Sequence, residues 1–325
     1  ADGTPDTLAA PRWLPSPLGV VAGMLRLRQL PLPERLRLLR VGLAAMTQQP
    51  RPIETAAQYL RRMKQSPAAC RRLWDPIIIA TLNTPPDQAA ASLFVRVLRL
   101  GFLGSRIDSQ LGVVESGLSA LHAPAGPCIE HHGGKVVVGA PVVGIELQPE
   151  GQFVVHLKER EAMVASQVIS TLPHASLRKI ASAAIQRRIP SLAQPMPLSP
   201  IVSLYLWFDS PLPQLPMFAA MIGTGVQWMF NKRTIVPTQN PRFPGLLSCT
   251  ISAAAAEAAG DAAGLVAIAE QELRGAFPEI GGARLLAWQV VKEKQATFAA
   301  TPATEAERPQ TDSSIPGLYL AGDWT

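Results

Sequence analysis

The stretch that decides the fold is PGLYLAGDWT, residues 316–325. Its apolar run, 318–321, is bounded by a Pro-Gly pair and by Gly322, which is typical of a buried strand in a parallel sheet. Ligands of such sheets bind at the carboxyl ends of the strands. Gly322 would let a ligand approach the backbone closely, and Asp323 would accept hydrogen bonds from the hydroxyls of a sugar-like group. The alternative is that this Gly-Asp pair forms a turn and nothing more.

The composition is that of a globular chain. It has 325 residues, of which 47% are hydrophobic and 17% charged, and this is ample material for a core. No long uncharged apolar run occurs, and the first ten residues lack the basic and apolar regions of a signal peptide. Because Cys70, Cys128 and Cys249 lie far apart and match no metal-binding spacing, we interpret them as reduced core residues of a cytoplasmic protein.

Positive charge is concentrated in residues 1–111, which carry 15 Lys and Arg against 7 Asp and Glu, a net charge of +8. Within this region, residues 25–46 interleave five arginines with leucines. A basic amphipathic stretch of this kind can lie on an anionic membrane surface, and the alternative is a surface helix whose arginines are only solvated. We expect no nucleic-acid partner, because the stretch offers almost no aromatic residues for base stacking.

The order of elements predicts an α+β protein with two sheets. Residues 17–104 are predicted to be helical, with Asp87 capping a helix that runs to Leu100. A loop and a helix ending at Gly133-Gly134 come next. The first predicted strands are 136–138, 142–147, 153–157 and 164–170. The second group comprises strands 201–208, 217–222, 226–230 and 245–252, one helix over 257–277, strand 284–291 and the closing strand.

Common catalytic motifs are absent from the sequence. There is no GxSxG, HExxH, P-loop or GxGxxG, and the five histidines show no metal-ligand spacing. His131 and His132 precede two glycines at the predicted end of a helix, where a histidine is electrostatically favourable. We therefore predict no metal site and assign no catalytic residue.

Several blocks of the sequence resemble the flavin-containing amine oxidase and phytoene desaturase superfamily. They are most similar to its squalene-associated branch, the hydroxysqualene dehydroxylases of bacterial hopanoid synthesis. The blocks are WDPIIIATLNTPPDQAAASLFVRVLR (74–99), GLSALHAPAGPCIEHHGGKVVVGAPVVGIEL (117–147), VISTLPHASLRKI (168–180), SLYLWFD (203–209), VQWMFNK (226–232), KEKQATFAATPATEAERP (292–309) and PGLYLAGDWT.

The resemblance implies an α+β and α/β fold, the amine oxidase-like architecture of FAD-linked reductases, with two interleaved domains. An FAD-binding domain would comprise residues 112–175 and 284–325, and a substrate domain of helices and a mixed sheet would comprise residues 1–111 and 176–283. The family's N-terminal dinucleotide fingerprint and its continuation after Gly-Asp-Trp-Thr have no counterpart here. We therefore expect an internal fragment with an incomplete FAD-binding domain.

The resemblance also implies which residues meet FAD. Gly322, Asp323 and Trp324 match the C-terminal piece, whose acid faces the ribityl and pyrophosphate part of the cofactor. The remaining matches are Val142 beside the adenine, Thr171, Leu172 and Pro173 over the AMP half, and Trp288 and Lys292 near the isoalloxazine.

The implied activity is that of an FAD-dependent oxidoreductase acting on a long isoprenoid, with reductive dehydroxylation of hydroxysqualene to squalene as the nearest match. Trp207, Phe208, Trp228 and Phe230 would line an apolar tunnel, and ordinary core packing is the alternative. The rival functions are a carotenoid-type desaturase, a flavin amine oxidase, and an inactive remnant or interaction module. We expect a cytoplasmic protein associated peripherally with the membrane.

Overall fold

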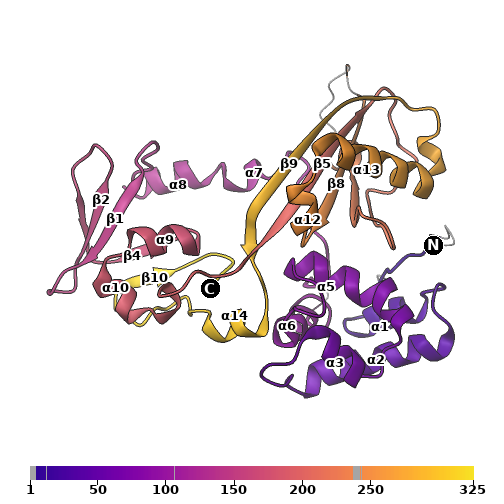
Figure 1. Ribbon diagram of the computed structural model, residues 1–325, viewed down its shortest axis with the longest axis horizontal. Coiled ribbons are helices and arrows are strands. Elements are labelled where there is room, and N and C mark those ends of the chain that lie inside the picture. The colour runs from indigo at the N-terminus through magenta and orange to yellow at the C-terminus, as the bar shows by residue number, and fades with distance from the viewer. Residues whose placement is uncertain (1–4, 12, 106, 237–241, 243) are drawn as a thin grey trace. The chain divides into compact units, whose positions relative to one another are not determined.

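The computed structural model describes residues 5–11, 13–105, 107–236, 242 and 244–325 (Figure 1). The chain forms two compact units. Unit 1 comprises residues 1–118 and 199–302, and unit 2 comprises residues 119–198 and 303–325. Each unit is thus built from two separated stretches of chain. The assignment of one unit to the cofactor and the other to the substrate stays a prediction.

The first half of unit 1 is helical, as predicted for residues 17–104. Its elements are α1 (Leu18–Leu25), α2 (Leu32–Thr47), α3 (Ala56–Arg62), α4 (Pro67–Ala69), the π-helix η1 (Cys70–Trp74), α5 (Asp75–Leu82) and α6 (Ala91–Gly101). The expectation that Asp87 caps α6 was wrong, since Ala90 is the N-cap. A turn intervenes, in which the main-chain N–H groups of Gln88 and Ala89 donate to the carbonyl of Pro85.

Aromatic side chains form the centre of the helical core. Tyr59, Trp74 and Phe94 are fully buried, and the ring of Phe94 meets the other two edge to face at centroid distances of 6.3 and 6.0 Å. The indole N–H of Trp74 donates to Gln65 Oε1 at 3.0 Å. This geometry satisfies the polar group of a large buried ring and is favourable for aromatic packing.

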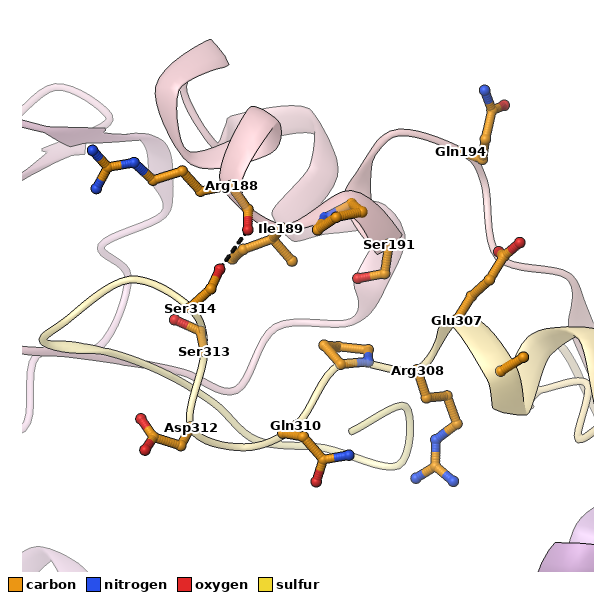
Figure 2. A pocket seen from close by; sticks show the side chains of 13 residues that line it. Arg188, Ile189, Ser191, Gln194, Glu307, Arg308, Gln310, Asp312, Ser313 and Ser314 are labelled. Atoms are coloured by element: carbon orange, nitrogen blue, oxygen red, sulfur yellow. Dashed lines mark hydrogen bonds between the residues drawn. The ribbon is translucent and has the colours of Figure 1, made fainter.

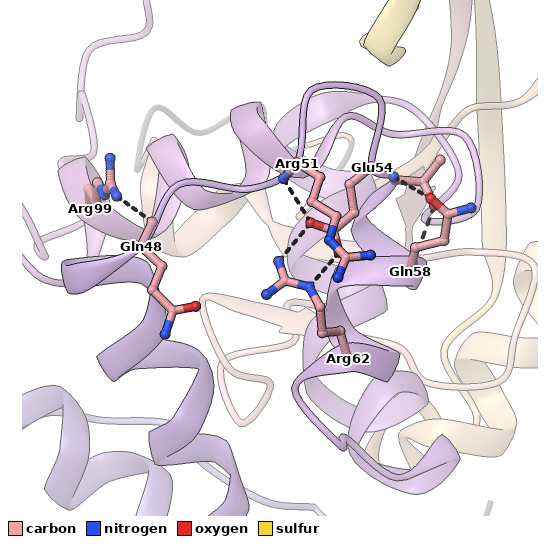
Figure 3. A network of polar contacts seen from close by, with 7 residues as sticks. Gln48, Arg51, Glu54, Gln58, Arg62 and Arg99 are labelled. Atoms are coloured by element: carbon pink, nitrogen blue, oxygen red, sulfur yellow. Dashed lines mark hydrogen bonds and ion pairs between the residues drawn. The ribbon is translucent and has the colours of Figure 1, made fainter.

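A buried carboxylate organises the segment before α3 (Figure 3). The two carboxylate oxygens of Glu54 accept hydrogen bonds from Arg62, each at 2.7 Å, and Oε2 also accepts from the main-chain N–H of Arg51 at 3.1 Å. The hydrogen bonds from Arg62 contribute most to lowering the pKa of Glu54, against the opposing effect of burial. In the same view, Arg99 donates to the carbonyl of Gln48 at 2.8 Å and ties α6 to the end of α2.

The second half of unit 1 is a five-stranded sheet of order β6-β7-β8-β5-β9. Its elements are β5 (Leu198–Phe208), β6 (Phe218–Ala220), β7 (Trp228–Asn231), α11 (Lys232–Ile235), β8 (Gly245–Ser252), α12 (Ala255–Ala259), α13 (Ala262–Ala276), η3 (Pro278–Ile280) and β9 (Leu285–Phe298). Val266, Ala269 and Leu273 of α13 are buried with the sheet residues in one core, so α13 covers one face of the sheet (Figure 1).

Two details of this half differ from the predicted elements. The single helix expected over 257–277 is divided, because α12 ends before Gly260 and Asp261 starts α13 as its N-cap, accepting from Gly264 N at 2.8 Å. The second concerns β9, which is hydrogen-bonded to β5 in the sheet of unit 1, whereas the family resemblance assigns residues 284–325 to the FAD-binding domain, an assignment that stays a prediction.

Asn83 joins the two halves of unit 1. It follows α5 in a left-handed conformation, with φ of 47°. Its Nδ2 donates to Ser199 O and to Thr297 Oγ1, both at 3.0 Å, and its Oδ1 accepts from Ala253 N at 2.6 Å. One side chain therefore binds three segments that are far apart in the sequence.

Unit 2 combines short helices with two small sheets. Its elements are α7 (Ser119–His122), α8 (Ala125–His131), β1 (Val142–Leu147), β2 (Phe153–Leu157), β3 (Met163–Ala165), β4 (Val168–Ser170), α9 (His174–Ile180), α10 (Ala183–Arg188), η2 (Pro190–Leu192), α14 (Pro302–Glu307) and β10 (Leu318–Leu320). Strands β1, β2 and β3 form an antiparallel sheet in that order.

Strands β4 and β10 pair in parallel, with Leu318 opposite Val168 and Leu320 opposite Ser170. The family resemblance assigns residues 136–138, 166–170 and 318–321 to one FAD-binding domain and so predicts that they share a sheet, and the pairing of the closing strand with residues 168–170 confirms this for two of the three segments. Two associated expectations were wrong. Residues 136–138 form no strand, and the strand predicted over 164–170 is divided at a bend into β3 and β4, which belong to different sheets.

Candidate functional site

The carboxyl ends of β4 and β10 form the candidate site of unit 2. Beyond the paired residues, Ala321 N donates to Ser170 O at 2.9 Å and keeps the two chains together. Thr171, Gly322 and Asp323 are then exposed at the same edge. The parallel pairing thus brings together two of the segments that the family resemblance assigned to the cofactor, although about 150 residues separate them.

The backbone at this edge requires glycine. Gly322 has a φ of +147°, a conformation that L side chains rarely adopt. A Cβ at this position would lie 3.3 Å from Cδ1 and Nε1 of Trp324. The hydroxyl of Ser170, buried at the last position of β4, has no hydrogen-bond partner among the described residues. An open backbone, the exposed carboxyl of Asp323 and an unpaired buried hydroxyl fit a polar, hydroxyl-bearing cofactor.

Trp324 is enclosed by protein rather than exposed at this edge. It is 2% exposed, and its Nε1 donates to Leu172 O at 3.0 Å. Its ring meets His174 edge to face with centroids 5.3 Å apart, and Nε2 of His174 lies 2.8 Å from Ser191 O. Trp324 therefore positions the two strand ends. We do not retain it as a direct cofactor contact.

The sequence did not indicate a role for Arg308. Its Nη1 donates to Glu305 Oε2 at 2.7 Å, and its Nη2 donates to the main-chain carbonyls of Asp323, at 3.4 Å, and Thr325. Arg308 thus attaches the turn at Asp323 to the carboxyl end of α14. Its position in the family-like block 292–309 is the one signal that could have drawn attention to it.

A hollow of about 680 Å³ in unit 2 adjoins this turn (Figure 2). It lies between the α10–η2 segment and the chain after α14, where Ser314 Oγ donates to Arg188 O. Arg308 and Asp312 line it, whereas none of the residues predicted to meet the cofactor does. Because the predicted cofactor residues lie outside this hollow, we take the strand ends, and not the hollow, as the candidate cofactor site.

Of the other predicted cofactor residues, Pro173 follows Leu172 at the strand ends and three lie elsewhere. Val142 opens β1 and pairs with Leu157 in the antiparallel sheet of unit 2. Pro173 is exposed just before α9. Trp288 and Lys292 lie on β9 of unit 1, where Trp288 is 45% exposed and Lys292 Nζ donates to the carbonyl of Gly260. The strand ends thus carry Gly322, Asp323 and the 171–173 segment but not Val142, Trp288 or Lys292.

One face of the sheet in unit 1 is aromatic. It carries Trp207, Trp228 and Phe230, three of the four residues predicted to line a lipid tunnel, together with Tyr205 and Phe218. Tyr205 lies 6.3 Å from Trp207, and Phe218 lies 6.3 Å from Trp228 and 6.2 Å from Phe230, measured between ring centroids. Four of these rings are half-buried and Phe218 is exposed, so each ring keeps part of its surface accessible to solvent.

Phe208 lies on the opposite face. It is fully buried in the core that α13 covers, and the guanidinium of Arg274 lies 6.0 Å from its ring centroid. Successive residues of a strand point to opposite sides, so Phe208 cannot share a face with Trp207. We therefore remove Phe208 from the proposed lining. The same alternation predicts that Tyr205, two residues before Trp207, shares its face, and this pattern could have identified Tyr205 from the sequence.

The cysteines are free. Burial raises the pKa of Cys70 to about 11 and that of Cys249 to about 12, so both thiols are protonated at neutral pH. The expectation of a core position was wrong for Cys128, which is exposed on α8. Within the described ranges, no cluster of three His, Cys, Asp or Glu side chains could hold a metal ion.

A family model described as flavin containing amine oxidoreductase matches residues 3–325. The protein is a member of this family. Membership of the flavin-containing amine oxidoreductases implies a flavin cofactor, and the exposed Asp323 beside a glycine-only backbone fits that cofactor.

Curated relatives of this family member include two bacterial hydroxysqualene dehydroxylases. The protein from Rhodopseudomonas palustris is 32% identical over 265 residues, which are 78% of this chain and 56% of that protein. The protein from Sinorhizobium fredii is 29% identical over 266 residues, which are 78% of this chain and 57% of that protein. The chain thus spans a little over half the length of these relatives.

Solved structures share the fold of this family member. An oxidoreductase from Methanosarcina mazei matches with a TM-score of 0.69 and 18% identity, over 91% of this chain and 68% of that one. A double mutant of putrescine oxidase matches with a TM-score of 0.65 and 14% identity, over 98% of this chain and 72% of that one. At these identities the likeness concerns the fold alone.

Proposed function

We propose that the protein is an FAD-dependent oxidoreductase that converts hydroxysqualene to squalene for hopanoid synthesis. The observation that carries this proposal is the agreement among its curated relatives. Proteins from three bacteria, 26% to 32% identical to it over 78% or 79% of this chain, are all named hydroxysqualene dehydroxylase.

The strand ends of unit 2 would hold part of the cofactor. Asp323 would accept hydrogen bonds from cofactor hydroxyls, and Gly322 would let the cofactor approach the backbone. Arg308 and Trp324 would keep this turn in place through their bonds to Asp323 O and Leu172 O. Replacing C–OH by C–H consumes two electrons and two protons and releases water, and a bound flavin, re-reduced by an external donor, would supply the electrons.

The aromatic face of unit 1 would receive the isoprenoid chain. Tyr205 and Trp207 on β5, and Phe218, Trp228 and Phe230 on β6 and β7, form two aromatic groups on this face. Ser248 and Thr250 of β8 lie between the two groups. Such a surface binds a hydrocarbon chain by area and excludes water from it. None of these five side chains is an acid, so they would orient the chain and not protonate the leaving hydroxyl.

A long isoprenoid is apolar and partitions into membranes, so the protein would act at the cytoplasmic surface of a bilayer. In the described part of the chain, no helix is both long and apolar enough to cross a membrane. The net charge of +8 over residues 1–111 supports attraction to anionic lipids. A peripheral, electrostatically assisted association is therefore part of the proposal.

Product analysis tests the proposal. The purified protein, loaded with FAD and supplied with a chemical reductant, is incubated with hydroxysqualene or, under oxidising conditions, with phytoene. We expect squalene from the first substrate and no further desaturation of the second. Desaturated phytoene without squalene formation would assign the protein to the carotenoid-type desaturases instead.

A further inference from the structure

Helix α2 carries an apolar stripe on the side away from the core. The stripe consists of Leu32, Leu36, Leu39, Leu43 and Met46. Four of these side chains are between 52% and 65% exposed, and Leu39 is half-buried. Spacings of four, three, four and three residues place all five on one face of a helix. Leu38 and Val41, which are fully buried, occupy the opposite side, so α2 is apolar on both sides while only one of them is packed.

Arginines flank the stripe. Arg40 is exposed on one side of it, and Arg35 lies on the other, where its guanidinium donates to Leu30 O at 2.6 Å and Leu25 O at 3.1 Å. Arg37 is exposed further round the helix. Glu34, the one acidic residue of α2, is turned to the packed side, where its carboxylate accepts from Ser66 Oγ at 2.6 Å. The outward side of α2, which the structure describes along its whole length, thus carries cations and no carboxylate.

We propose that this stripe inserts into the headgroup region of an anionic bilayer, with α2 parallel to the membrane surface. The inference rests on the proposed function, whose substrate resides in membranes. A helix of 16 residues is about 24 Å long, too short to span the hydrocarbon core but suited to lie in the interface. In that orientation the leucines lie below the headgroups and the arginines at their level.

Charge selects a lipid surface over a second copy of the chain. The net charge of +8 over residues 1–111 is complementary to anionic headgroups. In an antiparallel two-fold arrangement of two copies docked stripe to stripe, Arg40, which lies near the middle of α2, would instead come close to its counterpart, and like charges so placed repel. Burial of the apolar stripe would drive insertion into the headgroup region, and the arginines would give the preference for anionic lipids.

The decisive variant is Leu36→Gln/Leu43→Gln in the full chain. Glutamine is a good helix former, and both positions are exposed, so helix content and thermal unfolding should match those of the wild type. Ile268→Gln is the matched control, since Ile268 is a 52% exposed apolar residue on another long helix, α13. Arg37→Gln/Arg40→Gln tests the electrostatic component. Binding is measured by co-sedimentation with phosphatidylcholine vesicles that contain or lack phosphatidylglycerol, at low and high salt, and oligomeric state is measured in parallel.

We expect the wild type to bind the anionic vesicles, with affinity falling as salt rises. The leucine variant should bind about tenfold to hundredfold more weakly, the arginine variant about tenfold more weakly with a smaller salt dependence, and Ile268→Gln should bind like the wild type. Equal binding by the wild type and the leucine variant would overturn the inference. So would a wild-type dimer that the leucine variant dissociates without any change in vesicle binding. Because vesicle binding needs neither flavin nor substrate, a failure to form squalene would count against the proposed function and leave this result intact.

Discussion

Asn83 and Ser199, 116 residues apart in the chain, exchange two hydrogen bonds. Asn83 Nδ2 donates to Ser199 O at 3.0 Å, and Ser199 Oγ donates to Asn83 O at 2.5 Å. Both residues are buried, at 4% and 7% exposure, and this pair fastens the helical half of unit 1 to the start of its sheet. The aromatic face on β5 is therefore held by a polar contact as well as by apolar packing.

Replacing Asn83 should destabilise unit 1 through two separable effects. Asn83→Gly keeps the left-handed backbone but removes the side-chain bonds to Ser199 O, Thr297 and Ala253, and should lower the free energy of unfolding by about 2 to 3 kcal/mol. Asn83→Ala adds backbone strain of about 1 kcal/mol. Urea denaturation measures both. A glycine variant as stable as the wild type would show that the side chain contributes nothing.

The Glu54–Arg62 pair should make stability depend on pH. Arg62 lowers the folded-state pKa of Glu54, so the pair stabilises the fold fully above the unfolded-state pKa of about 4.3 and loses its contribution as the pH falls through the folded-state pKa. Glu54→Gln should cost about 1 to 3 kcal/mol at pH 7. The difference in unfolding free energy between the two proteins should shrink as the pH is lowered from 5 towards 3, measured by urea denaturation at each pH. If this difference in unfolding free energy stayed constant with pH, the charge of Glu54 would not contribute to stability.

Asp323→Asn tests the cofactor role of the strand ends. If the carboxylate accepts hydrogen bonds from flavin hydroxyls, the amide loses the charge-assisted part and presents a donor, which corresponds to about tenfold to hundredfold weaker FAD binding. If Asp323 only makes a turn, Asn serves equally well. Fluorescence titration of each apoprotein with FAD separates these outcomes, because unchanged dissociation constants support the turn alone.

Trp324→Phe should loosen the same edge without touching the carboxylate. Phenylalanine keeps much of the contact with His174 but loses the hydrogen bond to Leu172 O, at a cost of about 1 to 2 kcal/mol. We expect a lower melting temperature and weaker FAD binding together. Trp13→Phe is the control, since Trp13 is 78% exposed, and it should change neither quantity. Weaker FAD binding at an unchanged melting temperature would indicate direct contact between Trp324 and the cofactor.

The two faces of the unit 1 sheet should respond differently to substitution. Phe230→Ala removes a half-buried ring from the aromatic face and should weaken squalene binding about tenfold, with a modest loss of stability. Phe208→Leu, in the packed core, should lower stability by about 1 to 2 kcal/mol and leave squalene affinity unchanged. Calorimetric unfolding and a ligand-displacement assay measure the two effects. Equal loss of affinity in both variants would contradict the assignment of faces.

Local sequence patterns determined most of the elements. The helical character of residues 17–104, most strands of both groups and the strand nature of 318–321 follow from periodicity and from Pro and Gly punctuation, because backbone propensity and one-sided burial act over a few neighbouring residues. The same local rules gave the wrong boundaries at Gly260 and within 164–170. There, a single N-cap or a bend interrupts a run whose composition does not change.

Tertiary structure alone decided which segments meet. No sequence pattern predicts that the side chain of Asn83 binds Ser199 and Thr297. The same is true of the bond from Arg308 to the turn at Asp323 and of the place of β9 in the sheet of unit 1. The pairing of β4 with β10 could be predicted only because the chain resembles a known family. These contacts join residues far apart in the chain, and their energies depend on distance and burial in three dimensions, which local periodicity does not encode.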